Sequence, residues 1–548
     1  MPEDRPTTGD ALSASGLGRR QFLQAAAAGG LLLGAGGALA ACGSSGSSSS
    51  PQTSAAAATG KPVHGGTLKV AIAGGSTSDT MDPNNAYNTP DWVRVPTVYE
   101  QLANINAKGE AQLQLAEEIT PNAKATEWTV RVRKGVTFHN GKELTADDVM
   151  FTIARILNPK ALAEGWTLIN SIDVAGMKKL DKYTCSIPCK TPFATFKDTF
   201  ACWNFAIVPS QGFNPKVPSG MIGTGAFKVS SFNPGVDSVF VRHKDYWITG
   251  LPYADQVVIT DYTDETAQIN ALLAGEVNMI GQLSADGAQL VATQSKSNII
   301  YSPGGAFQPF TMRVDLAPFK DNRVRQALRL IVDRKQMLDV VFRGRGTMGN
   351  DVFGIWSPSY DHSIPQRAQD IDKAKSLLKA AGHPDLSLEL ITGDIQGGIV
   401  AAAQVFVQQA SAAGVTVNIR KVTPNQFFAA HNYTFWPFAQ DWWFYNFYLP
   451  QVALTTTPGA PGNETHWDNP RYISLYKQAI AQPNDQLRHE IEHEMQMIDY
   501  NEGGLIVPYF QPIIDATAAN VHGVVPSRTG GSFNSQMGAS DYKYFWIS

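Results

Sequence analysis

The spacing of apolar residues in the first third of the chain predicts strands joined by tight turns. Residues 66–72 (GTLKVAI) are rich in β formers and predict a first strand, which leads into a loop at 74–85. Residues 128–133 (WTVRVR) carry an apolar side chain at every second position, so they predict a strand with one buried face. The Asn-Gly pair within 136–141 predicts the turn that follows.

Two later segments have the start and stop signals of helices. Thr145 to Asp148 predicts a helix start, because the Thr145 oxygen can accept a backbone N–H and acidic side chains favour the positive end of a helix. Gly275 is expected to end a helix over 269–274, with a strand at 276–280 after it.

Helix and strand then alternate along the second half of the chain. Asp321 is expected to cap one continuous helix over 322–340. The order of helix followed by strand recurs at 372–380 with 386–391, and at 404–413 with 415–419. This alternation predicts an α/β architecture with mixed sheets.

The composition is that of a globular chain long enough for two to four domains. Of the 548 residues, 43% are hydrophobic and 17% are charged, which argues against wholesale disorder. Lys and Arg number 44 against 48 Asp and Glu, a net charge of −4 that leaves no basic excess to neutralise phosphates. We therefore expect no nucleic-acid partner.

The first 41 residues have the layout of an export signal. Arg19-Arg20 precedes an uncharged run over 22–41 that is rich in Ala and Gly, as in a twin-arginine signal peptide. The run 39–42 (LAAC) resembles the bacterial lipobox, in which the cysteine is joined to diacylglycerol and begins the mature protein. We expect cleavage after residue 41, lipidation of Cys42 and a flexible tether over 42–64. The alternative is an uncleaved signal anchor, since about 20 apolar residues can span a bilayer.

Three cysteines remain beyond the tether, namely Cys185, Cys189 and Cys202. An odd number in an oxidising compartment permits at most one disulfide within the chain, so structural packing and a single bridge both stay open. The Cys-x3-Cys spacing has no companion pair that would complete a zinc site.

Several runs together resemble the family 5 extracellular solute-binding proteins, the peptide-class receptors of ABC importers. The most recognisable stretch is 128–149, and the resemblance covers nearly all of 65–548. The later runs that carry it are 223–228 (GTGAFK, with Ala226 in place of the usual Pro), 245–247 (DYW), 318–319 with 323–328, and 377–378 with 381–382.

The resemblance implies a two-lobed, periplasmic-binding-protein-like α/β fold with mixed sheets, a hinge and an extra subdomain in lobe one. Lobe one would span 65–305, with the inserted subdomain at about 106–215, and would receive the final segment 511–548. Lobe two would span 306–510. A ligand enclosed between the lobes would be delivered to ABC permease subunits in the membrane.

The same resemblance implies a binding protein rather than an enzyme, without a cofactor. We expect an exported, extracytoplasmic monomer held at the outer face of the cell membrane by the lipid on Cys42, where the tether raises its effective concentration at the permease. The ligand that the resemblance favours is a peptide. A sugar, an opine or a metal complex stays open, because one fold can host different sites.

The run 435–443 resembles the family segment in which a carboxylate, preceded by an aromatic residue three positions earlier, holds the α-ammonium of a peptide. Carried over, Asp441 is the carboxylate and Phe438 the aromatic residue, while Trp442 and Trp443 could line side-chain pockets. The alternative interpretation makes Asp441 a loop cap and the aromatic residues part of the core.

Two further residues are candidates for ligand contact. Tyr87 occupies a region that approaches the ligand in the family. Arg313 stands near a position where the family often has Asn, and it could pair with a ligand carboxylate or merely with Asp315.

One motif favours a different class of protein. Residues 489–493 (HEIEH) satisfy the H-E-x-x-H pattern that presents two imidazoles to zinc with Glu as a general base, so a membrane-tethered zinc hydrolase is the alternative. No Gly-x-x-His extension follows, and charges on several faces of 487–500 are typical of a solvated surface helix.

Overall fold

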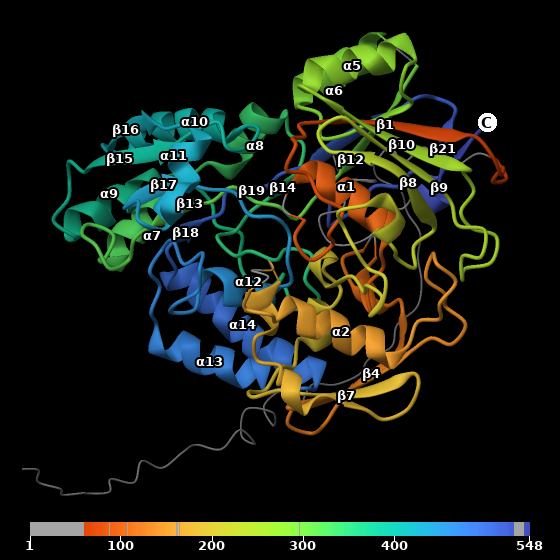
Figure 1. Cartoon of the computed structure of the whole chain (residues 1–548). Coiled ribbons are helices and arrows are strands. Elements are labelled where there is room, and N and C mark those ends of the chain that lie inside the picture. Colours follow the sequence, from red (N-terminus) through yellow and green to blue (C-terminus); the bar gives the residue numbers. More distant parts are fainter. Residues whose placement is uncertain are drawn as a thin grey trace, which may run out of the picture. The chain divides into compact units, whose positions relative to one another are not determined.

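The computed structural model describes residues 60–548 except positions 87, 107, 161, 162, 164, 295 and 531–541. Within this part of the chain, helices and strands alternate around two large mixed sheets and one smaller antiparallel sheet (Figure 1). The mixed α/β class predicted from the sequence is therefore confirmed. None of the helices in these residues combines the length and apolarity that a membrane crossing requires. The expectations for the export signal, for Cys42 and for Tyr87 lie outside the described residues.

The first large sheet has seven strands. Its strand order is β12 (Asn298–Ser302), β20 (Ile513–Thr517), β11 (Met279–Ile280), β1 (Thr67–Ala73), β10 (Gln256–Tyr262), β9 (Asp237–Arg242) and β8 (Phe227–Asn233). β1 runs parallel to β10 and β11, and the other neighbours are antiparallel.

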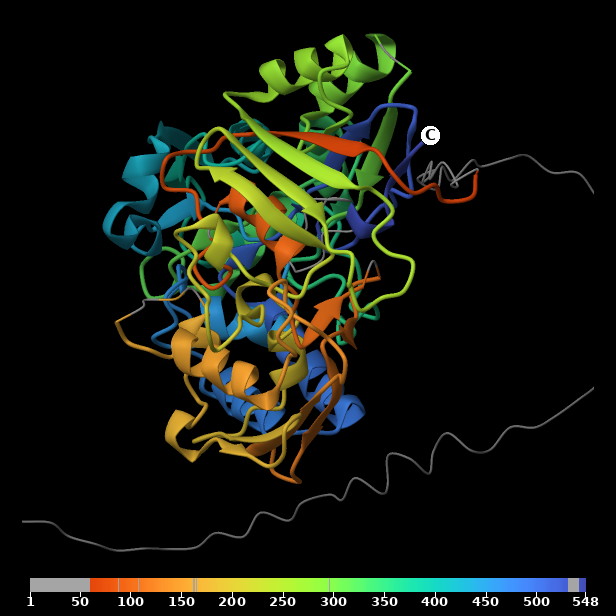
Figure 2. The ribbon, with the colours of Figure 1, turned by 45° about the vertical axis from the view of Figure 1, so that its right-hand side comes forward.

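Helices cover this sheet because its strands are apolar on both faces. In β1, Leu68, Val70 and Ile72 belong to the same buried cluster as the valines of α1 (Thr89–Val98). Ala71 points the other way and joins the cluster of α5 (Glu265–Ala274) and α6 (Ala285–Gln294), which lie together over the sheet in Figures 1 and 2.

A four-stranded antiparallel sheet is inserted between β1 and β8. Its order is β4 (Ala116–Pro121), β5 (Glu127–Val132), β7 (Thr184–Pro188) and β6 (Lys178–Lys179). The shorter elements beside it are β2 (Ala103–Ile105), β3 (Ala111–Leu113), α2 (Ala146–Ile156), α3 (Trp166–Ile169), α4 (Phe196–Thr199), and the 3-10 turns η1 (Val174–Gly176), η2 (Trp203–Phe205) and η3 (Pro218–Gly220). We call the seven-stranded and four-stranded sheets with their helices the first lobe.

The predicted start of α2 is correct, and Thr145 and Asp148 form a reciprocal capping box there. The Asp148 carboxylate accepts hydrogen bonds from the Thr145 backbone N–H and from the Thr145 hydroxyl, both at 2.9 Å. The acidic side chain at the third helical position thus provides the side-chain acceptor at this helix start.

Glu100 joins motif runs that are far apart in the sequence. This buried carboxylate accepts hydrogen bonds from the hydroxyls of Thr224 (2.9 Å) and Tyr246 (2.6 Å), from the indole of Trp247 (2.9 Å) and from the amide of Gln114 (3.2 Å). With four donors, the buried charge is satisfied without a cation. The GTGAF and DYW runs therefore serve to build the first lobe.

The second large sheet has five strands, in the order β16 (Thr416–Lys421), β15 (Ser387–Thr392), β17 (Phe438–Gln440), β13 (Phe310–Met312) and β18 (Leu505–Ile506). The helices of this part are α7 (Asn322–Ile331), α8 (Arg334–Phe342), α9 (Ile371–Ala380), α10 (Ile399–Ala412), α11 (Pro424–Phe428), α12 (Tyr448–Thr455), α13 (Pro470–Ile480) and α14 (Asp485–Glu502), with the 3-10 turn η4 (Ala429–Thr434). We call this sheet and these helices the second lobe.

Two boundaries differ from the sequence-based expectation. The single helix expected over 322–340 is wrong, because α7 ends at Ile331 and α8 begins at Arg334. Asp333 lies between them in an extended conformation and accepts the Gln336 backbone N–H at 2.9 Å, so it caps a new helix instead of continuing the old one. The strand expected at 276–280 is reduced to β11.

The chain crosses between the two large sheets twice, through residues 303–309 and 507–512, the second of which contains β19 (Tyr509–Phe510). The two crossing segments lie side by side. The Gln511 backbone N–H donates to the Ala306 carbonyl at 2.8 Å, and the rings of Phe307 and Phe510 meet at 6.0 Å. The remaining strands form two small pairs, β14 (Thr347–Met348) with β19, and β21 (Val521–His522) with β22 (Trp546–Ile547) beside the 3-10 turn η5 (Tyr542–Tyr544).

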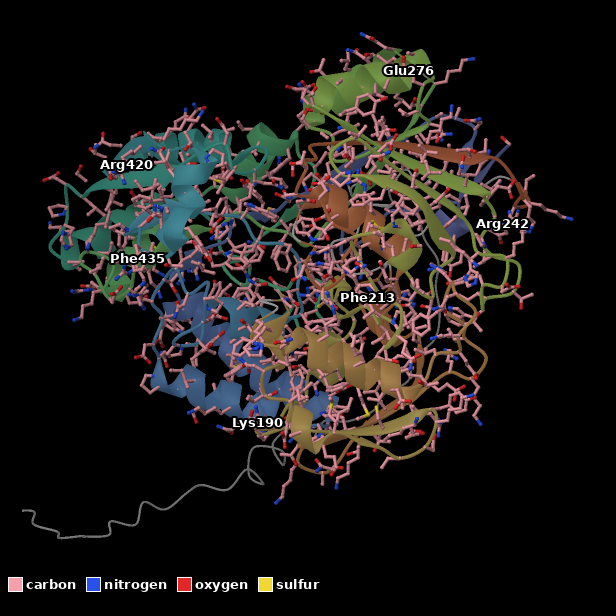
Figure 3. All side chains as sticks on the ribbon, in the orientation of Figure 1. Lys190, Phe213, Arg242, Glu276, Arg420 and Phe435 are labelled. Atoms are coloured by element: carbon pink, nitrogen blue, oxygen red, sulfur yellow. The ribbon has the colours of Figure 1, made fainter. Side chains whose placement is uncertain are left out.

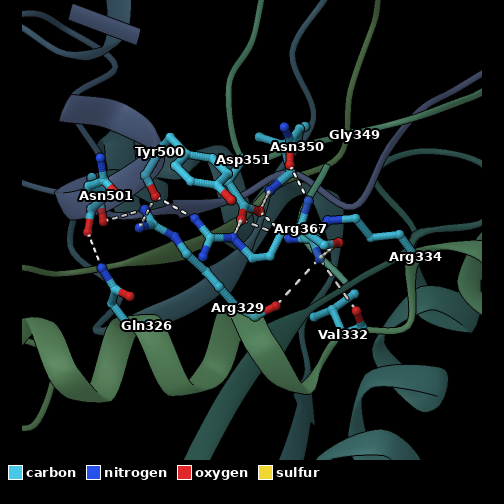
Figure 4. Close-up of polar contacts among 12 residues, drawn as sticks. Gln326, Arg329, Val332, Arg334, Gly349, Asn350, Asp351, Arg367, Tyr500 and Asn501 are labelled. Carbon is cyan, nitrogen blue, oxygen red and sulfur yellow. Dashed lines mark hydrogen bonds and ion pairs between the residues drawn. The ribbon is translucent and has the colours of Figure 1, made fainter. Parts of the chain in front are cut away.

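A buried ion cluster anchors the second crossing segment to the second lobe (Figure 4). Asp351 accepts two hydrogen bonds from Arg334 at 2.7 Å, one from Arg367 at 2.8 Å and one from the Val507 backbone N–H at 3.1 Å. Arg329 donates to the carbonyls of Asp499, Tyr500, Gly503 and Leu505 at 2.6–3.2 Å. Because each buried charge has oxygen or guanidinium partners, the cluster fixes this end of the crossing rigidly.

We expect Glu100→Ala to lower the free energy of unfolding by at least about 3 kcal/mol, because three buried donors and one half-buried donor lose their acceptor. Urea unfolding followed by circular dichroism measures this. The matched control is Glu117→Ala, which removes an exposed carboxylate 3.5 Å from Arg131 and should change stability by less than about 1 kcal/mol. Equal effects of the two substitutions would contradict the role given to Glu100.

Candidate functional site

A cavity of about 490 Å³ lies between segments of the two lobes. The first lobe lines it with Ala86, Trp92, Ala163, Thr167, Leu168 and residues 202–204, and the second lobe with Phe428, Tyr433, residues 441–444, Asn446, Leu454, Pro461 and Gly462. Among these described residues, Asp441 is the only carboxylate, and there is no Lys, Arg or His. A concave, mostly apolar cavity with few polar groups is the usual form of a small-molecule site.

Four aromatic side chains form a row that crosses from one lobe to the other. The ring centroids of Trp92 and Trp203 lie 5.6 Å apart, those of Trp203 and Phe444 lie 5.4 Å apart, and those of Phe444 and Trp443 lie 6.4 Å apart. The first two contacts are edge to face, the arrangement that aromatic quadrupoles favour. The row gives the cavity a continuous apolar wall built from both lobes.

The run 441–443 is attached to the first crossing segment. The Asp441 backbone N–H donates to the Pro309 carbonyl at 3.2 Å. Phe307 and Trp443 exchange two backbone hydrogen bonds, each 2.9 Å long. The candidate ligand contacts therefore sit directly on one of the two segments that join the lobes.

Asp441 has a second carboxyl group as its neighbour. Asp441 and Glu464 are both buried, with 2% and 3% of their surface exposed, and the charge of Asp441 acts on the Glu464 carboxyl. Asp441 Oδ1 accepts the Trp442 backbone N–H at 2.7 Å, and Glu464 Oε1 accepts the Trp443 indole N–H at 2.8 Å. Trp443 thus lies against the cavity on one side and holds Glu464 on the other.

Burial shifts the titration of both acids in the same direction. Loss of hydration raises the pKa of Asp441 to about 7, against a smaller opposing effect of the Trp442 N–H. Loss of hydration also raises the pKa of Glu464 well above its ordinary value, and the nearby charge of Asp441 adds to that rise. Both shifts favour the protonated forms of these two acids.

The structure brings together three of the residues singled out by sequence, namely Asp441, Trp442 and Trp443. Phe438 lies elsewhere, in the core of the second lobe, with its ring 5.4 Å from that of Phe319 and 5.8 Å from that of Phe406. Successive side chains of a strand point to opposite faces, so a residue three positions before Asp441 faces away from it.

Arg313 also lies outside the cavity lining. Its guanidinium makes two hydrogen bonds to Asp315, at 2.7 and 2.8 Å, and one to the Phe435 carbonyl at 3.3 Å. Of the two pairings considered from the sequence, the structure contains the one with Asp315. Phe435 itself is 61% exposed, and Figure 3 labels it at the edge of the second lobe near Arg420.

Sequence reasoning did not find the first-lobe wall or the second carboxyl group. Trp92 and Trp203 stand in a helix and a 3-10 turn without any pattern that distinguishes them from core residues. Glu464 follows a Gly-Asn pair in an irregular loop, and its partner Asp441 is 23 positions earlier. Only the tertiary fold puts these residues at one cavity.

The three cysteines are free thiols. Burial raises the pKa of Cys185 and of Cys189 to about 12, and raises that of Cys202 further. Cys202 lines the cavity, with its sulfur 4.0 Å from Asn446 Oδ1 of the other lobe. The sequence left both structural packing and a single disulfide open for these cysteines. In the structure they are packed in the interior and are not joined to one another.

The HEIEH run lies on α14, beside a second cleft of about 120 Å³. His489 and Glu492 line this cleft, whereas Glu490 is exposed on another face of the helix. The Glu492 carboxyl is held by the Ser359 hydroxyl and lies 3.4 Å from Arg488. Among the described residues, no group of three His, Cys, Asp or Glu side chains is arranged to hold a metal ion.

Comparison with known proteins gives a family match over most of the chain. Residues 110–464 match the model of the "Bacterial extracellular solute-binding proteins, family 5 Middle". The glutathione-binding protein GsiB of Salmonella typhimurium (strain LT2) is 26% identical over 497 residues, which cover 85% of this chain and 93% of that protein.

Solved structures show the same fold. The protein DppA of Helicobacter pylori in complex with the peptide STSA matches with a TM-score of 0.73 and 18% identity, covering 88% of this chain and 98% of that one. NikA of Staphylococcus aureus in complex with Ni(L-His)2 matches with a TM-score of 0.69 and 17% identity, covering 88% and 100%. These likenesses confirm the two-lobed, periplasmic-binding-protein-like fold expected from the sequence.

We expect Glu464→Gln to stabilise the unliganded protein increasingly as the pH rises from 5 to 8. A carboxyl group whose pKa is raised by folding contributes stability that is complete below its unfolded pKa and is lost as the pH rises through the folded value. The variant does not lose this stability as the pH rises. The difference in free energy of unfolding between the variant and the natural protein should therefore grow by up to about 1.4 kcal/mol per pH unit.

Urea unfolding at pH 5, 6, 7 and 8 measures the difference. The control is Glu389→Gln, which changes an exposed carboxylate of the same lobe, 3.4 Å from Arg420, and should give a difference that does not vary with pH. A pH-independent difference for Glu464→Gln as well would contradict the protonated state assigned to the pair.

Proposed function

Because the chain belongs to family 5 of the bacterial extracellular solute-binding proteins, we propose that its cavity captures a small amine-bearing solute, a short peptide in the first place, and presents it to an ABC permease. The observation that carries this proposal is the charge of the cavity. Its described lining offers one carboxylate, Asp441, and no cationic side chain. An ammonium group is the natural partner of such a site, because a buried acid gains charge-assisted hydrogen bonds from it.

In this proposal the two lobes have different tasks. Asp441 holds the ammonium from the second lobe, while Trp442 and Trp443 contact the apolar part of the solute. Trp92 and Trp203 cover it from the first lobe. Contacts with both lobes stabilise the closed arrangement relative to an open one, and the permease recognises the closed arrangement.

The lining also indicates which chemical groups the cavity would accept at the other end of the solute. Since no Lys or Arg is among the described lining residues, a free carboxylate inside the cavity would have no cationic partner. The GsiB relatives are named as glutathione-binding proteins, and glutathione is a tripeptide with two carboxylates. Our proposal is that this receptor prefers solutes whose inner part is cationic and apolar, with any carboxylate left at the mouth of the cavity.

Export and anchoring belong to the same proposal. A twin-arginine signal over 1–41, a lipid on Cys42 and a tether over 42–64 would keep the receptor at the outer face of the cell membrane. The lobe boundaries in this proposal are 65–305, 306–510 and 511–548, with the inserted subdomain at about 106–215. The membership of β20 in the seven-stranded sheet supports the return of the final segment to the first lobe. The receptor would act as a monomer, without chemistry of its own.

We expect the dipeptide amide L-Ala-L-Phe-NH2 to bind to the soluble chain that begins at residue 60, with a change in tryptophan fluorescence. The N-acetylated amide should not bind measurably, because it has no ammonium group. Asp441→Asn should weaken binding of the amide by about 100-fold or more. The free dipeptide should bind more weakly than the amide, and glutathione more weakly still.

The control is Asp468→Asn, an exposed acid of the same lobe, which should leave the affinity unchanged. Binding that survives both N-acetylation and Asp441→Asn would contradict the ammonium contact. If neither the dipeptide nor its amide binds at millimolar concentration, the proposed ligand class is wrong.

We expect Cys42→Ser to release the protein from the cell membrane. Two acyl chains anchor a protein stably, and the serine variant would carry none. Partition in Triton X-114 separates the two forms, with the natural protein in the detergent phase and the variant in the aqueous phase. Equal partition of both would contradict lipidation.

A further inference from the structure

We propose that Asn204 and Asn446 form an amide-reading pair, which binds the N–H and the carbonyl of an amide in the solute from opposite lobes. Asn204 accepts the amide N–H, and Asn446 donates to the carbonyl oxygen. The inference rests on the proposed function and deepens it, because it names the uncharged group that the receptor recognises besides the ammonium. Both residues determine specificity through hydrogen bonds alone, since neither side chain carries a charge.

Asn204 stands in the first-lobe wall of the cavity with an acceptor that no protein group uses. The residue lines the cavity and is 4% exposed. Its Oδ1 atom is buried and meets no donor among the described residues. A buried acceptor without a hydrogen bond costs free energy, so native structures rarely contain one that neither water nor a ligand satisfies.

The backbone of Asn204 is fixed independently of its side chain. Its carbonyl accepts a hydrogen bond from the Asn84 side chain at 2.8 Å, and Asn84 in turn accepts one from the Arg155 guanidinium. The indole of the neighbouring Trp203 donates to the Ala86 carbonyl at 3.2 Å. None of these contacts uses the side-chain amide of Asn204. The amide is therefore held in the cavity wall before a ligand arrives, which is what a specific site requires.

Asn446 offers the opposite group from the second lobe. It lines the same cavity, two positions before α12 begins, and is 3% exposed. Its Oδ1 accepts the Phe447 backbone N–H at 2.9 Å and lies 4.0 Å from the Cys202 sulfur. Because Oδ1 is the acceptor in this contact, Nδ2 remains as the donor of the side chain. It meets no acceptor in the part of the chain that the structure describes.

The pair matches the two hydrogen-bonding groups of a trans amide. The carbonyl and the N–H of a trans amide point to opposite sides, so one amide can reach an acceptor on one lobe and a donor on the other. Cys202, two positions before Asn204, lies against Asn446, so both side chains stand where the lobes approach each other. An amide held by both would stabilise the closed arrangement relative to an open one.

A carboxylate or an ester fits this pair less well than an amide. Neither group has an N–H, so Asn204 Oδ1 would stay without a donor when such a group faced it. The described lining also has no Lys, Arg or His that would neutralise a carboxylate. The pair thus adds a requirement for an amide N–H to the requirement for an ammonium at Asp441.

Calorimetry with two probes that differ in one group tests the inference. L-alanine 2-phenylethylamide has an ammonium, a single amide and an aromatic ring, and L-alanine 2-phenylethyl ester has oxygen in place of the amide N–H. At pH 6.0 both amines are charged, since α-amino groups titrate near pH 7.7–8.0, as is typical. The natural protein should bind the amide about tenfold or more tightly than the ester.

Substitution of each asparagine should remove a different part of this preference. Asn204→Ala should weaken binding of the amide to about the affinity of the ester, and should leave the ester unchanged within about twofold. Asn446→Ala should weaken the amide and the ester together, by about three- to tenfold, because both have a carbonyl. The E-alkene analogue, which has no carbonyl, should bind equally to Asn446→Ala and the natural protein. The control is Asn418→Ala, an exposed residue of β16, which should change no affinity.

The outcomes separate this inference from the proposed function. If the natural protein binds amide and ester equally while Asp441→Asn abolishes binding of both, the amide contact is wrong and the ammonium contact stands. If Asn204→Ala weakens amide and ester to the same extent, the residue is merely structural and the inference is wrong. If Asp441→Asn binds both probes like the natural protein, the ammonium contact fails, and the ratio of amide to ester affinity still decides the inference.

Two further results are decisive. If neither probe binds at millimolar concentration, the proposed ligand class and the amide contact are both wrong. If an asparagine variant does not fold, the comparison of the amide and the ester in the natural protein decides alone.

Discussion

The pairing of the two crossing segments is the constraint on which the rest of the structure depends. Gln511 and Ala306 join the segments by a backbone hydrogen bond, and a Cβ on Gly304 would collide with the Gln511 carbonyl, so the two strands can lie this close only with glycine there. Asp351 holds one segment through Val507, and the run 441–443 is bonded to the other. The relation between the lobes and the position of the candidate ligand contacts are thus set at the same place.

This arrangement explains how a single ligand could contact both lobes at once. The first-lobe wall, Trp92 and Trp203, meets Phe444 of the second lobe by ring contact alone, without a backbone hydrogen bond between those residues. Ring contacts of this kind can be separated at a modest cost in free energy. Phe307 and Trp443, in contrast, are joined by two backbone hydrogen bonds. Opening would have to separate both the aromatic row and the backbone hydrogen bond from Ala194 to Ile480, and it would leave Asp441 on its crossing segment.

Much of the fold could be predicted from the sequence, because its signals are local. The alternation of apolar and polar residues in 128–133 indicates a pleated strand, and the glycine after α5 indicates the end of that helix. Both features are determined by residues that are neighbours in the sequence. The break between α7 and α8 was missed because Asp333 caps a helix inside a continuous apolar pattern. The site could be predicted only in part: the resemblance pointed to Asp441, Trp442 and Trp443, but no spacing rule connects Asp441 with Glu464 or Trp203. Their proximity is a product of the crossing segments.

The central claim, that Asp441 receives a ligand cation inside an aromatic cavity, is tested most directly by a crystal structure of the protein with L-Ala-L-Phe-NH2 bound. Our account predicts the ligand nitrogen within about 3 Å of an Asp441 carboxylate oxygen, with Trp203 and Trp443 against the ligand from opposite lobes. A ligand that places a carboxylate or an uncharged group at Asp441, or that binds outside this cavity, would contradict it.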